Sequence, residues 1–177
     1  MHILGEEEVD AVRRVIESRR LYRYHEEHAS ESMAFEREWS EKIRCQHTII
    51  MSSGTAALIC GLVGMGIGPG DEVIVPAYTF MATPLAVLAV GAVPVIAEID
   101  ETLTIDMKDA ERKITSATKA IIPVHMCGFH CDMDAVMSVA SAHGLMVLED
   151  ACQAAGGSYK GTRLGAIGDA GAFSFNE

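Results

Sequence analysis

The chain has 177 residues, of which 49% are hydrophobic and 22% are charged, and its formal net charge is −11. This composition suits a domain of ordinary size with a filled core and excludes a disordered chain. The 14 Lys and Arg residues form no basic block, so a nucleic-acid-binding face is not expected.

The cysteines, the N-terminal residues and the longest apolar run indicate the cellular compartment of the protein. Five cysteines occur at irregular spacing, which does not suit a disulfide framework. The first ten residues carry neither the basic nor the apolar region of a signal peptide. The longest apolar run, residues 85–97, is broken by Gly91 and Pro94 and is too short to span a bilayer. We therefore expect a cytoplasmic protein with free thiols and no membrane segment.

Two amphipathic helices are predicted in the first part of the chain. Residues 5–20 repeat apolar side chains at helical spacing, with acids early and arginines late, the order that the helix dipole favours. Residues 33–44 show a second apolar stripe that includes Trp39. The polar, irregular segment between them, residues 21–32, is predicted as a loop.

From residue 47 onward, short apolar strands alternate with helices. This pattern predicts an α/β fold of three layers, α/β/α, with a mostly parallel sheet covered on both faces. The Gly-rich residues 151–175 are predicted as two short strands joined by turns. The predicted strands are 47–51, 73–76, 93–100, 119–125 and 145–150, and the predicted helices are 55–66, 84–92, 107–114 (capped by Asp106) and 132–144 (ending at Gly144).

Ligands of parallel sheets bind at the carboxyl ends of the strands, and the first such end is rich in small residues. Gly54 would let a ligand approach the backbone, and the amides of Thr55 and Ala56 would be free donors at a helix N-terminus. The hydroxyl of Thr55 adds a donor, so the segment could cradle a phosphate. Alternatively, Ser53 or Thr55 simply caps the helix.

Three other side chains at predicted strand ends also have two interpretations. Phe80 could stack on a planar cofactor or belong to the core. Asp150 ends a buried strand and needs a partner, which could be a cationic ring nitrogen, a buried Arg or a helix N-terminus. Ser174 lies between two aromatic residues on a predicted strand, where it could bind a phosphate oxygen or be an ordinary strand serine.

Seven segments follow one another along nearly the whole chain: GEEEVDAVRRVIES, SSGTAAL, GPGDEVIVPAYTFMAT, GAVPVIAEID, IIPVHMCGFHCDMD, VLEDACQAAGGSYKG and GDAGAFSF. In this order, they resemble the DegT/StrS family of pyridoxal-phosphate enzymes, mostly sugar aminotransferases with the aspartate-aminotransferase fold (fold type I). The resemblance implies an N-terminal helical segment at residues 1–45 and a large pyridoxal-phosphate-binding domain at residues 46–177, incomplete at its C-terminus and without the family's small domain.

The same resemblance assigns roles to the phosphate end of the cofactor site. Gly54, Thr55 and Ala56 match the family's phosphate-binding turn. Ser174 matches a phosphate ligand that precedes the catalytic lysine.

At the ring end, Phe80 matches the aromatic residue that stacks on the pyridine ring, and Gln153 matches a polar side chain near the phenolic oxygen. Asp150 matches the carboxylate that pairs with the pyridine nitrogen, and it is the catalytic residue expected in this chain. A protonated ring nitrogen makes the cofactor an electron sink.

The activity implied by the resemblance is transamination of a keto sugar, often nucleotide-linked, with glutamate or glutamine as the amino donor. The family's Schiff-base lysine would fall two residues beyond Glu177, so we expect this chain alone to be inactive and a second chain or C-terminal half to carry the lysine. Two alternatives stay open. The chain could be a non-catalytic or cofactor-binding partner half of a split enzyme, or part of a histidine-type sugar dehydratase.

One segment of the chain departs from the family pattern, and one cluster of side chains resembles a set of metal ligands. Residues 21–32 are longer and more charged than the family's usual WLTTGP segment, which widens the expected substrates to an aminocyclitol or another cyclic ketone. The cluster HMCGFHC, residues 125–131, offers four metal-ligand side chains, but structural zinc sites draw on two separated pairs, so no metal is expected. A homo- or hetero-oligomer is expected because the family's sites form at a dimer interface and an unpaired sheet edge needs covering.

Overall fold

The computed structural model describes residues 5–23 and 30–176. Two compact units are present, one within residues 5–50 and the other formed by Met51–Asn176. The division into a helical segment at residues 1–45 and a cofactor domain at residues 46–177 stays a prediction.

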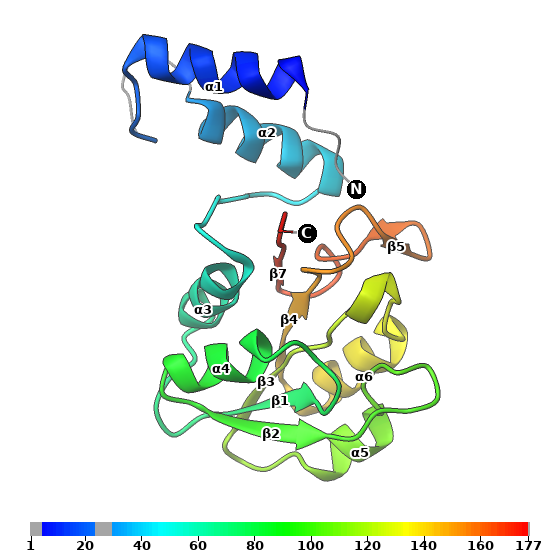
Figure 1. The fold of residues 1–177 in the computed structure, drawn as a ribbon. Helices are drawn as coiled ribbons and strands as arrows, with labels where there is room; N and C mark the ends of the chain where they lie inside the picture. The colour runs from blue at the N-terminus through cyan, green and yellow to red at the C-terminus, as the bar shows by residue number, and fades with distance from the viewer. Residues whose placement is uncertain (1–4, 24–29, 177) are drawn as a thin grey trace. The chain divides into compact units, whose positions relative to one another are not determined.

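The Met51–Asn176 unit is built on a five-stranded sheet with the order β2-β1-β3-β4-β7 (Figure 1). All neighbouring strands in this sheet are parallel, which confirms the predicted α/β class. A separate antiparallel pair, β5–β6, lies in the Gly-rich segment. The strands are β1 (Glu72–Pro76), β2 (Val93–Ala97), β3 (Thr118–Ile121), β4 (Met146–Asp150), β5 (Ser158–Tyr159), β6 (Thr162–Arg163) and β7 (Ala170–Ala172).

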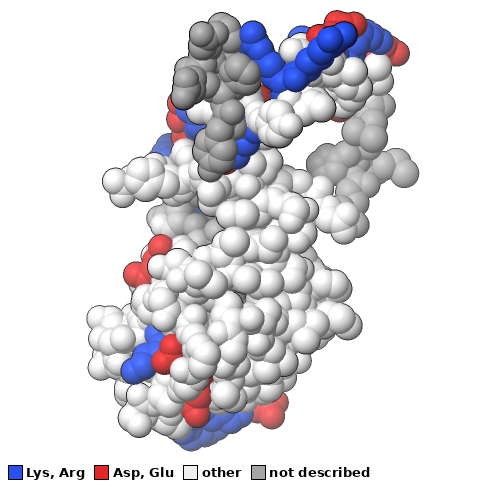
Figure 2. All heavy atoms as spheres, turned by 90° about the vertical axis from the view of Figure 1, so that its left-hand side faces the viewer, with Lys and Arg blue, Asp and Glu red and all other residues white. Residues whose placement is uncertain are grey.

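Helices cover both faces of this sheet, as the alternation of strands and helices predicts. Helices α3 and α4 lie on one face, and α5 and α6 lie on the other (Figure 1). The side formed by α3 and α4 shows few charged side chains (Figure 2). The helices are α3 (Gly54–Gly64), α4 (Ala82–Ala89), α5 (Met107–Arg112), the short 3-10 helix η1 (Met126–Gly128) and α6 (Met133–His143).

Alternation along each strand divides the core into two clusters. Val73 and Val75 of β1 face α3 and α4, whereas Ile74 between them faces α5 and α6. On β4, Leu148 packs with the first cluster and Val147 with the second. Successive strand residues point to opposite faces, so the apolar residues of the inner strands β1 and β3 are buried on both faces, whereas Val93 and Ile96 of the edge strand β2 are about half exposed. Burial on both faces explains why these strands carry apolar residues at consecutive positions and not only at every second position.

The predicted helix boundaries at Asp106 and Gly144 are confirmed. The Asp106 carboxylate accepts the amide of Lys108 at 2.9 Å at the start of α5. Gly144 ends α6 with a φ of 66°, a left-handed conformation that glycine adopts without a steric cost. Among the described residues, no helix is long and apolar enough to cross a membrane.

The structure contradicts the strand predicted at residues 47–51. These residues form no regular element, and Ile49 is 57% exposed. A strand needs a neighbour that pairs with its backbone, and the amide of Ile50 instead donates to the side chain of Glu36 at 2.8 Å.

The Gly-rich segment also differs from its prediction, since it holds three short strands rather than two. Ser174 lies beyond the last of them and not on a strand. Strand β7 pairs only as far as Ala172, which lies opposite Asp150, the last residue of β4. Pairing therefore stops before Ser174 because the partner strand has ended.

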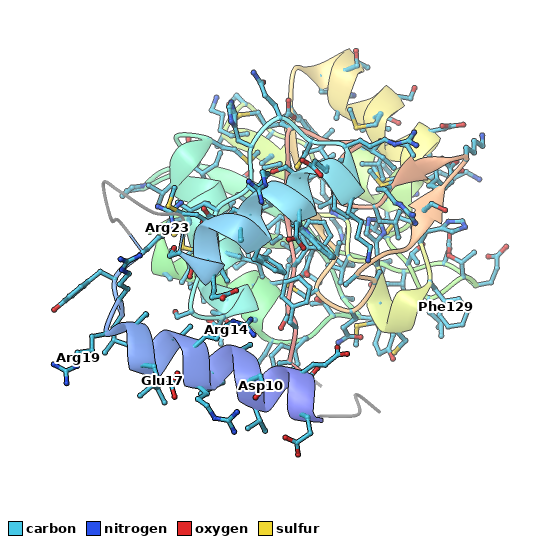
Figure 3. All side chains as sticks on the ribbon, turned by 90° about the horizontal axis from the view of Figure 1, so that it is seen from above. Asp10, Arg14, Glu17, Arg19, Arg23 and Phe129 are labelled. Carbon is cyan, nitrogen blue, oxygen red and sulfur yellow. The ribbon has the colours of Figure 1, made fainter. Side chains whose placement is uncertain are left out.

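The unit within residues 5–50 contains α1 (Glu6–Ser18) and α2 (Glu31–Ile43), which confirms both predicted helices. Helix α1 buries none of its residues, and Asp10, Arg14 and Glu17 project from it (Figure 3). Helix α2 begins before its predicted start because the Ser30 hydroxyl caps it by accepting the amide of Met33. Most of the predicted loop, residues 24–29, lies outside the described residues.

Glu36 holds this unit together. Its carboxylate accepts hydrogen bonds from the Arg23 guanidinium at 2.9 and 2.7 Å and from the amide of Ile50. The Arg23 hydrogen bonds lower the pKa of Glu36, against the opposing effect of burial. The Glu36 carboxylate therefore joins the segment before α2 through its ion pair with Arg23 and the segment after α2 through the amide of Ile50.

Candidate cofactor site

Asp150 lies at the carboxyl end of β4 and is 5% exposed. Its Oδ2 accepts a hydrogen bond from the Thr83 hydroxyl at 2.7 Å, and its Oδ1 accepts one from the amide of Cys152 at 3.2 Å. The Thr83 hydroxyl also lies 2.7 Å from the hydroxyl of Thr79. Both donors to Asp150 are neutral, and no described Lys or Arg forms an ion pair with it.

The sequence left three kinds of partner open for Asp150. The described residues supply neither a buried Arg nor a helix amide as its partner. A carboxylate has about four sites for hydrogen-bond donors, and the donors from Thr83 and Cys152 occupy two of them. A buried carboxylate with neutral donors favours a cation beside it. The residues present therefore fit a protonated ring nitrogen.

Gly54 starts α3 at a point where three segments of the chain meet. A Cβ atom at this position would lie 2.9 Å from the Cys152 Sγ and 3.0 Å from the Ser174 Cβ. Real Cβ atoms rarely make contacts this short. The close approach brings the predicted residues Gly54 and Ser174 together, next to the residue that donates to Asp150.

The start of α3 combines both interpretations of its sequence. Ser53 caps the helix, because its hydroxyl accepts the amide of Ala56 at 3.1 Å. That amide is therefore not free, contrary to its predicted state. Among the described residues, neither the amide nor the hydroxyl of Thr55 has a hydrogen-bond partner, and Thr55 is exposed. Thr55 thus keeps the donors that a phosphate would need.

Phe80 follows β1 and is 60% exposed, so it is not a core aromatic residue. Its carbonyl oxygen accepts the amide of Thr83 at 3.1 Å, which places it one turn from the side chain that contacts Asp150. An exposed ring at this edge is available for stacking.

Gln153 and Ser174 each make a local hydrogen bond. The Gln153 side-chain oxygen accepts the amide of Cys127 at 2.9 Å, which joins the loops after β3 and β4. The Ser174 hydroxyl accepts the amide of Asn176 at 3.2 Å and can still donate to a ligand.

Two buried polar contacts, one in the site and one next to it, were not predicted from the sequence. Thr83 is fully buried and contacts Asp150, and its signal was a lone polar residue in the first turn of an apolar helix. Glu149 pairs with His125 through a 3.1 Å contact between its Oε2 and the imidazole Nε2. The sequence pattern indicated His125 only as a potential metal ligand. Among the described residues, no three metal-ligand side chains converge.

The cysteines near the site differ in their expected reactivity. Burial raises the pKa of Cys131 to about 12, and burial together with the charge of Asp150 raises the pKa of Cys152. Cys60 and Cys127 are exposed. Since the thiolate is the reactive form, iodoacetamide at pH 8 should label the exposed pair at least about tenfold faster than the other two. Peptide mass spectrometry of timed samples measures this order, and rapid labelling of Cys152 would contradict it.

A separate cavity of about 450 Å³ lies between the loops that follow β2 and β3. None of the predicted cofactor residues lines it. Its lining residues are Glu101, Thr102, Leu103, Gly128, Phe129 and His130.

Comparisons with known proteins identify the family of this chain. A sequence model of the DegT/DnrJ/EryC1/StrS aminotransferase family matches residues 2–177. The spore coat polysaccharide biosynthesis protein SpsC of Bacillus subtilis is 44% identical over 174 residues, which are 98% of this chain and 43% of SpsC. The GDP-perosamine synthase of Caulobacter vibrioides is 46% identical over 142 residues, which are 80% of this chain and 38% of that protein.

A solved structure shares the fold. The crystal structure of DesV from S. venezuelae superposes with a TM-score of 0.89 at 44% sequence identity, over 96% of this chain and 45% of DesV. The chain thus spans less than half the length of these relatives.

Proposed function

Because the chain belongs to the DegT/DnrJ/EryC1/StrS aminotransferase family, we propose that Met51–Asn176 is the pyridoxal-phosphate-binding part of a sugar aminotransferase. The substrate class is a keto sugar, often nucleotide-linked, or a related cyclic ketone, and the amino donor is glutamate or glutamine. One observation carries the proposal: among the described residues, the buried Asp150 carboxylate at the carboxyl edge of the sheet has neutral donors and no ion-pair partner.

The cofactor, when bound, supplies the electron sink for moving an amino group. The contribution of this chain is to bind and orient it. Asp150 would hold a proton on the ring nitrogen, since an adjacent carboxylate favours the charged ring. Gly54, Thr55 and Ser174 would hold the phosphate, while Phe80 would cover one face of the ring.

Gln153 and Ala56 each use one polar group in a local hydrogen bond, which limits how they could contact the cofactor. The Gln153 side-chain nitrogen would face the phenolic oxygen, since its oxygen is engaged by Cys127. The amide of Ala56 is engaged by Ser53, so Ala56 would contribute by its small size.

We also propose that the lysine that reacts with the cofactor comes from another segment or a second chain. The lysines with described contacts are held elsewhere. Lys113 bonds to the carbonyl oxygen of Ile96 at 2.7 Å and pairs with Asp109. Lys119 donates to the carbonyl oxygen of Ser116 at 3.4 Å, and Lys160 pairs with Asp134. None of these groups belongs to the Asp150 site.

The names of the relatives support the substrate class. One relative is a GDP-perosamine synthase, which indicates an amino sugar carried on a nucleotide. The longer segment at residues 21–32 keeps other cyclic ketones within the proposal. The proposed partners are this small molecule and another protein chain, with no nucleic acid and no membrane.

The test uses the assembly that contains this chain. Pyridoxal phosphate is added, visible absorbance is recorded, and borohydride treatment is followed by peptide mass spectrometry. The proposal predicts a visible band that borohydride removes, a cofactor fixed to one lysine, and amino transfer from glutamate or glutamine. A bound cofactor that borohydride cannot fix to lysine would favour a histidine-type dehydratase. No binding at all would favour a non-catalytic partner chain.

The α3–α4 side is the proposed contact with the partner chain. Neither helix contains a charged residue, and Val63, Leu85 and Leu88 are all at least half exposed. This side is largely free of charged side chains (Figure 2). Apolar surface of this kind marks protein interfaces.

Leu88→Glu should therefore weaken association by about tenfold or more, as expected for a residue central to an interface. Ser138→Glu on the exposed face of α6 is the matched control and should leave the assembly intact. Sedimentation velocity over a range of concentrations measures both variants. Equal effects of the two variants would place the interface elsewhere.

A further inference from the structure

Glu149, the neighbour of Asp150 on β4, is fully buried. Its carboxylate accepts four hydrogen bonds. Oε1 accepts the amides of Ile167 at 2.6 Å and Gly168 at 2.7 Å. Oε2 accepts the amide of Gly165 at 2.8 Å and lies 3.1 Å from the imidazole Nε2 of His125. A single side chain therefore holds most of the loop at residues 165–168.

The protonation of His125 follows from its other nitrogen. Its Nδ1 accepts the amide of Cys131 at 3.2 Å, so Nδ1 carries no proton. In a neutral ring, Nε2 then carries the proton and donates to Glu149. All four groups around the carboxylate are donors, and they suit an ionised carboxylate. Burial alone would raise the pKa of Glu149, but the hydrogen bonds from His125 and the three amides outweigh it and lower the pKa.

The loop held by Glu149 leads directly to the phosphate end of the candidate site. It precedes β7, in which Gly171 lies opposite Glu149 and Ala172 lies opposite Asp150. Gly165 packs so closely on the ring of Phe173 that an added Cβ atom would collide with it. Phe173 is followed by Ser174, the residue that approaches Gly54. Contacts thus run without a gap from the Glu149 carboxylate to the phosphate cradle.

Glu149 and Asp150 act from opposite faces of the sheet. Adjacent residues of a strand point to opposite sides, and the contacts agree, since Asp150 bonds to Thr83 of α4 while Glu149 bonds to the loop at residues 165–168. Glu149 therefore makes no contact with the proposed cofactor site and acts on its geometry through the backbone that it holds.

We propose that Glu149 is a positioning residue for the phosphate end of the cofactor site: its buried carboxylate fixes the loop at residues 165–168 and, through Phe173, the place of Ser174 beside Gly54. The inference rests on the proposed function, because it concerns the same site. It adds a residue whose part is to hold the cradle in place, without contact to the cofactor.

Glu149→Gln is the direct test because it keeps the size of the side chain. In the wild-type protein, each oxygen of the Glu149 carboxylate accepts two hydrogen bonds. The substitution turns one of these oxygens into an NH2 group. The NH2 group must therefore face two donors whichever way the amide lies. Val136→Ala, at a buried α6 residue in the core cluster on the same side of the sheet, serves as the control for a loss of stability that keeps every hydrogen bond of Glu149.

The first measurement is amide hydrogen exchange without cofactor. Glu149→Gln should speed exchange at residues 165–174 more than elsewhere, whereas Val136→Ala should not single out this segment. The second is the affinity of the assembly for pyridoxal phosphate and for pyridoxal. Glu149→Gln should weaken the affinity for pyridoxal phosphate by about 10- to 100-fold, the scale known for losing a group that orients a metal ligand. It should weaken the affinity for pyridoxal less.

The outcomes separate the two proposals. Unchanged affinity for pyridoxal phosphate in Glu149→Gln would overturn the positioning role and leave the proposed function intact. The same loss in Val136→Ala, or an equal loss for pyridoxal, would show that Glu149 supports only the fold. A wild-type assembly that binds no pyridoxal phosphate would overturn the proposed function itself.

Discussion

Asp150→Asn is expected to lower cofactor-dependent turnover of the complete assembly by about 100- to 1,000-fold, the usual scale for losing one electrostatic group at a reacting centre. The neutral amide cannot favour a proton on the ring nitrogen as a carboxylate does. Turnover with glutamate or glutamine as the donor, measured at saturating pyridoxal phosphate, reports this loss separately from a weaker affinity.

The fold should survive this change. The asparagine oxygen can still accept the amide of Cys152, and its NH2 group can donate to the Thr83 hydroxyl, which can in turn donate to Thr79. The free energy of unfolding should therefore change by about 1 kcal/mol or less.

Asp169→Asn is a suitable control for Asp150→Asn. The Asp169 carboxylate accepts the amide of Val147 at 2.8 Å, near the opposite end of β4. This control should leave turnover close to that of the wild-type assembly. A parallel loss of turnover and stability in Asp150→Asn would instead make Asp150 a structural residue.

The parts of the fold that local pattern determines were predictable from the sequence. Strands such as 73–76 and 145–150 are short, apolar and bounded by turn residues, so their burial follows from composition. The caps at Asp106 and Gly144 depend on the conformations that single residues favour. These features need no information from distant parts of the chain.

The errors occurred where an element depends on a distant neighbour. Residues 47–51 have the composition of a strand, but strand formation needs a pairing partner that the described residues do not provide. The sequence pattern around Ser174 predicts a strand. The pairing of β7 nevertheless ends at Ala172, opposite Asp150, the last residue of β4. Neither outcome could be derived from the local sequence.

The candidate site shows the same division. The sequence predicted that strand ends carry the important residues, and the structure brings Gly54 and Ser174 together from segments 120 residues apart. Their roles in binding a cofactor remain predictions. The partners of the adjacent Glu149 and Asp150 were not predictable, because His125 and Thr83 reach them from other strand ends and helices.

Gly54→Ala should cause the largest structural loss at the phosphate end. The new Cβ atom would lie 2.9 Å from the Cys152 Sγ and 3.0 Å from the Ser174 Cβ, so one of these segments must move. Overpacking of this kind costs about 1–3 kcal/mol, and movement of Ser174 should also weaken pyridoxal phosphate binding. Gly64→Ala in the same helix meets no atom within 4 Å and should stabilise the protein by up to about 1 kcal/mol.

Urea unfolding of both variants, together with their affinities for pyridoxal phosphate, tests this difference. A second substitution identifies the contact responsible. Cys152→Ala removes the Sγ atom that the new methyl group would meet, so the double variant Gly54→Ala/Cys152→Ala should regain part of the stability lost in Gly54→Ala. A non-additive free energy in this cycle measures the contact between the two positions. Strictly additive effects, or equal effects of Gly54→Ala and Gly64→Ala, would show that the start of α3 does not form a tight cradle.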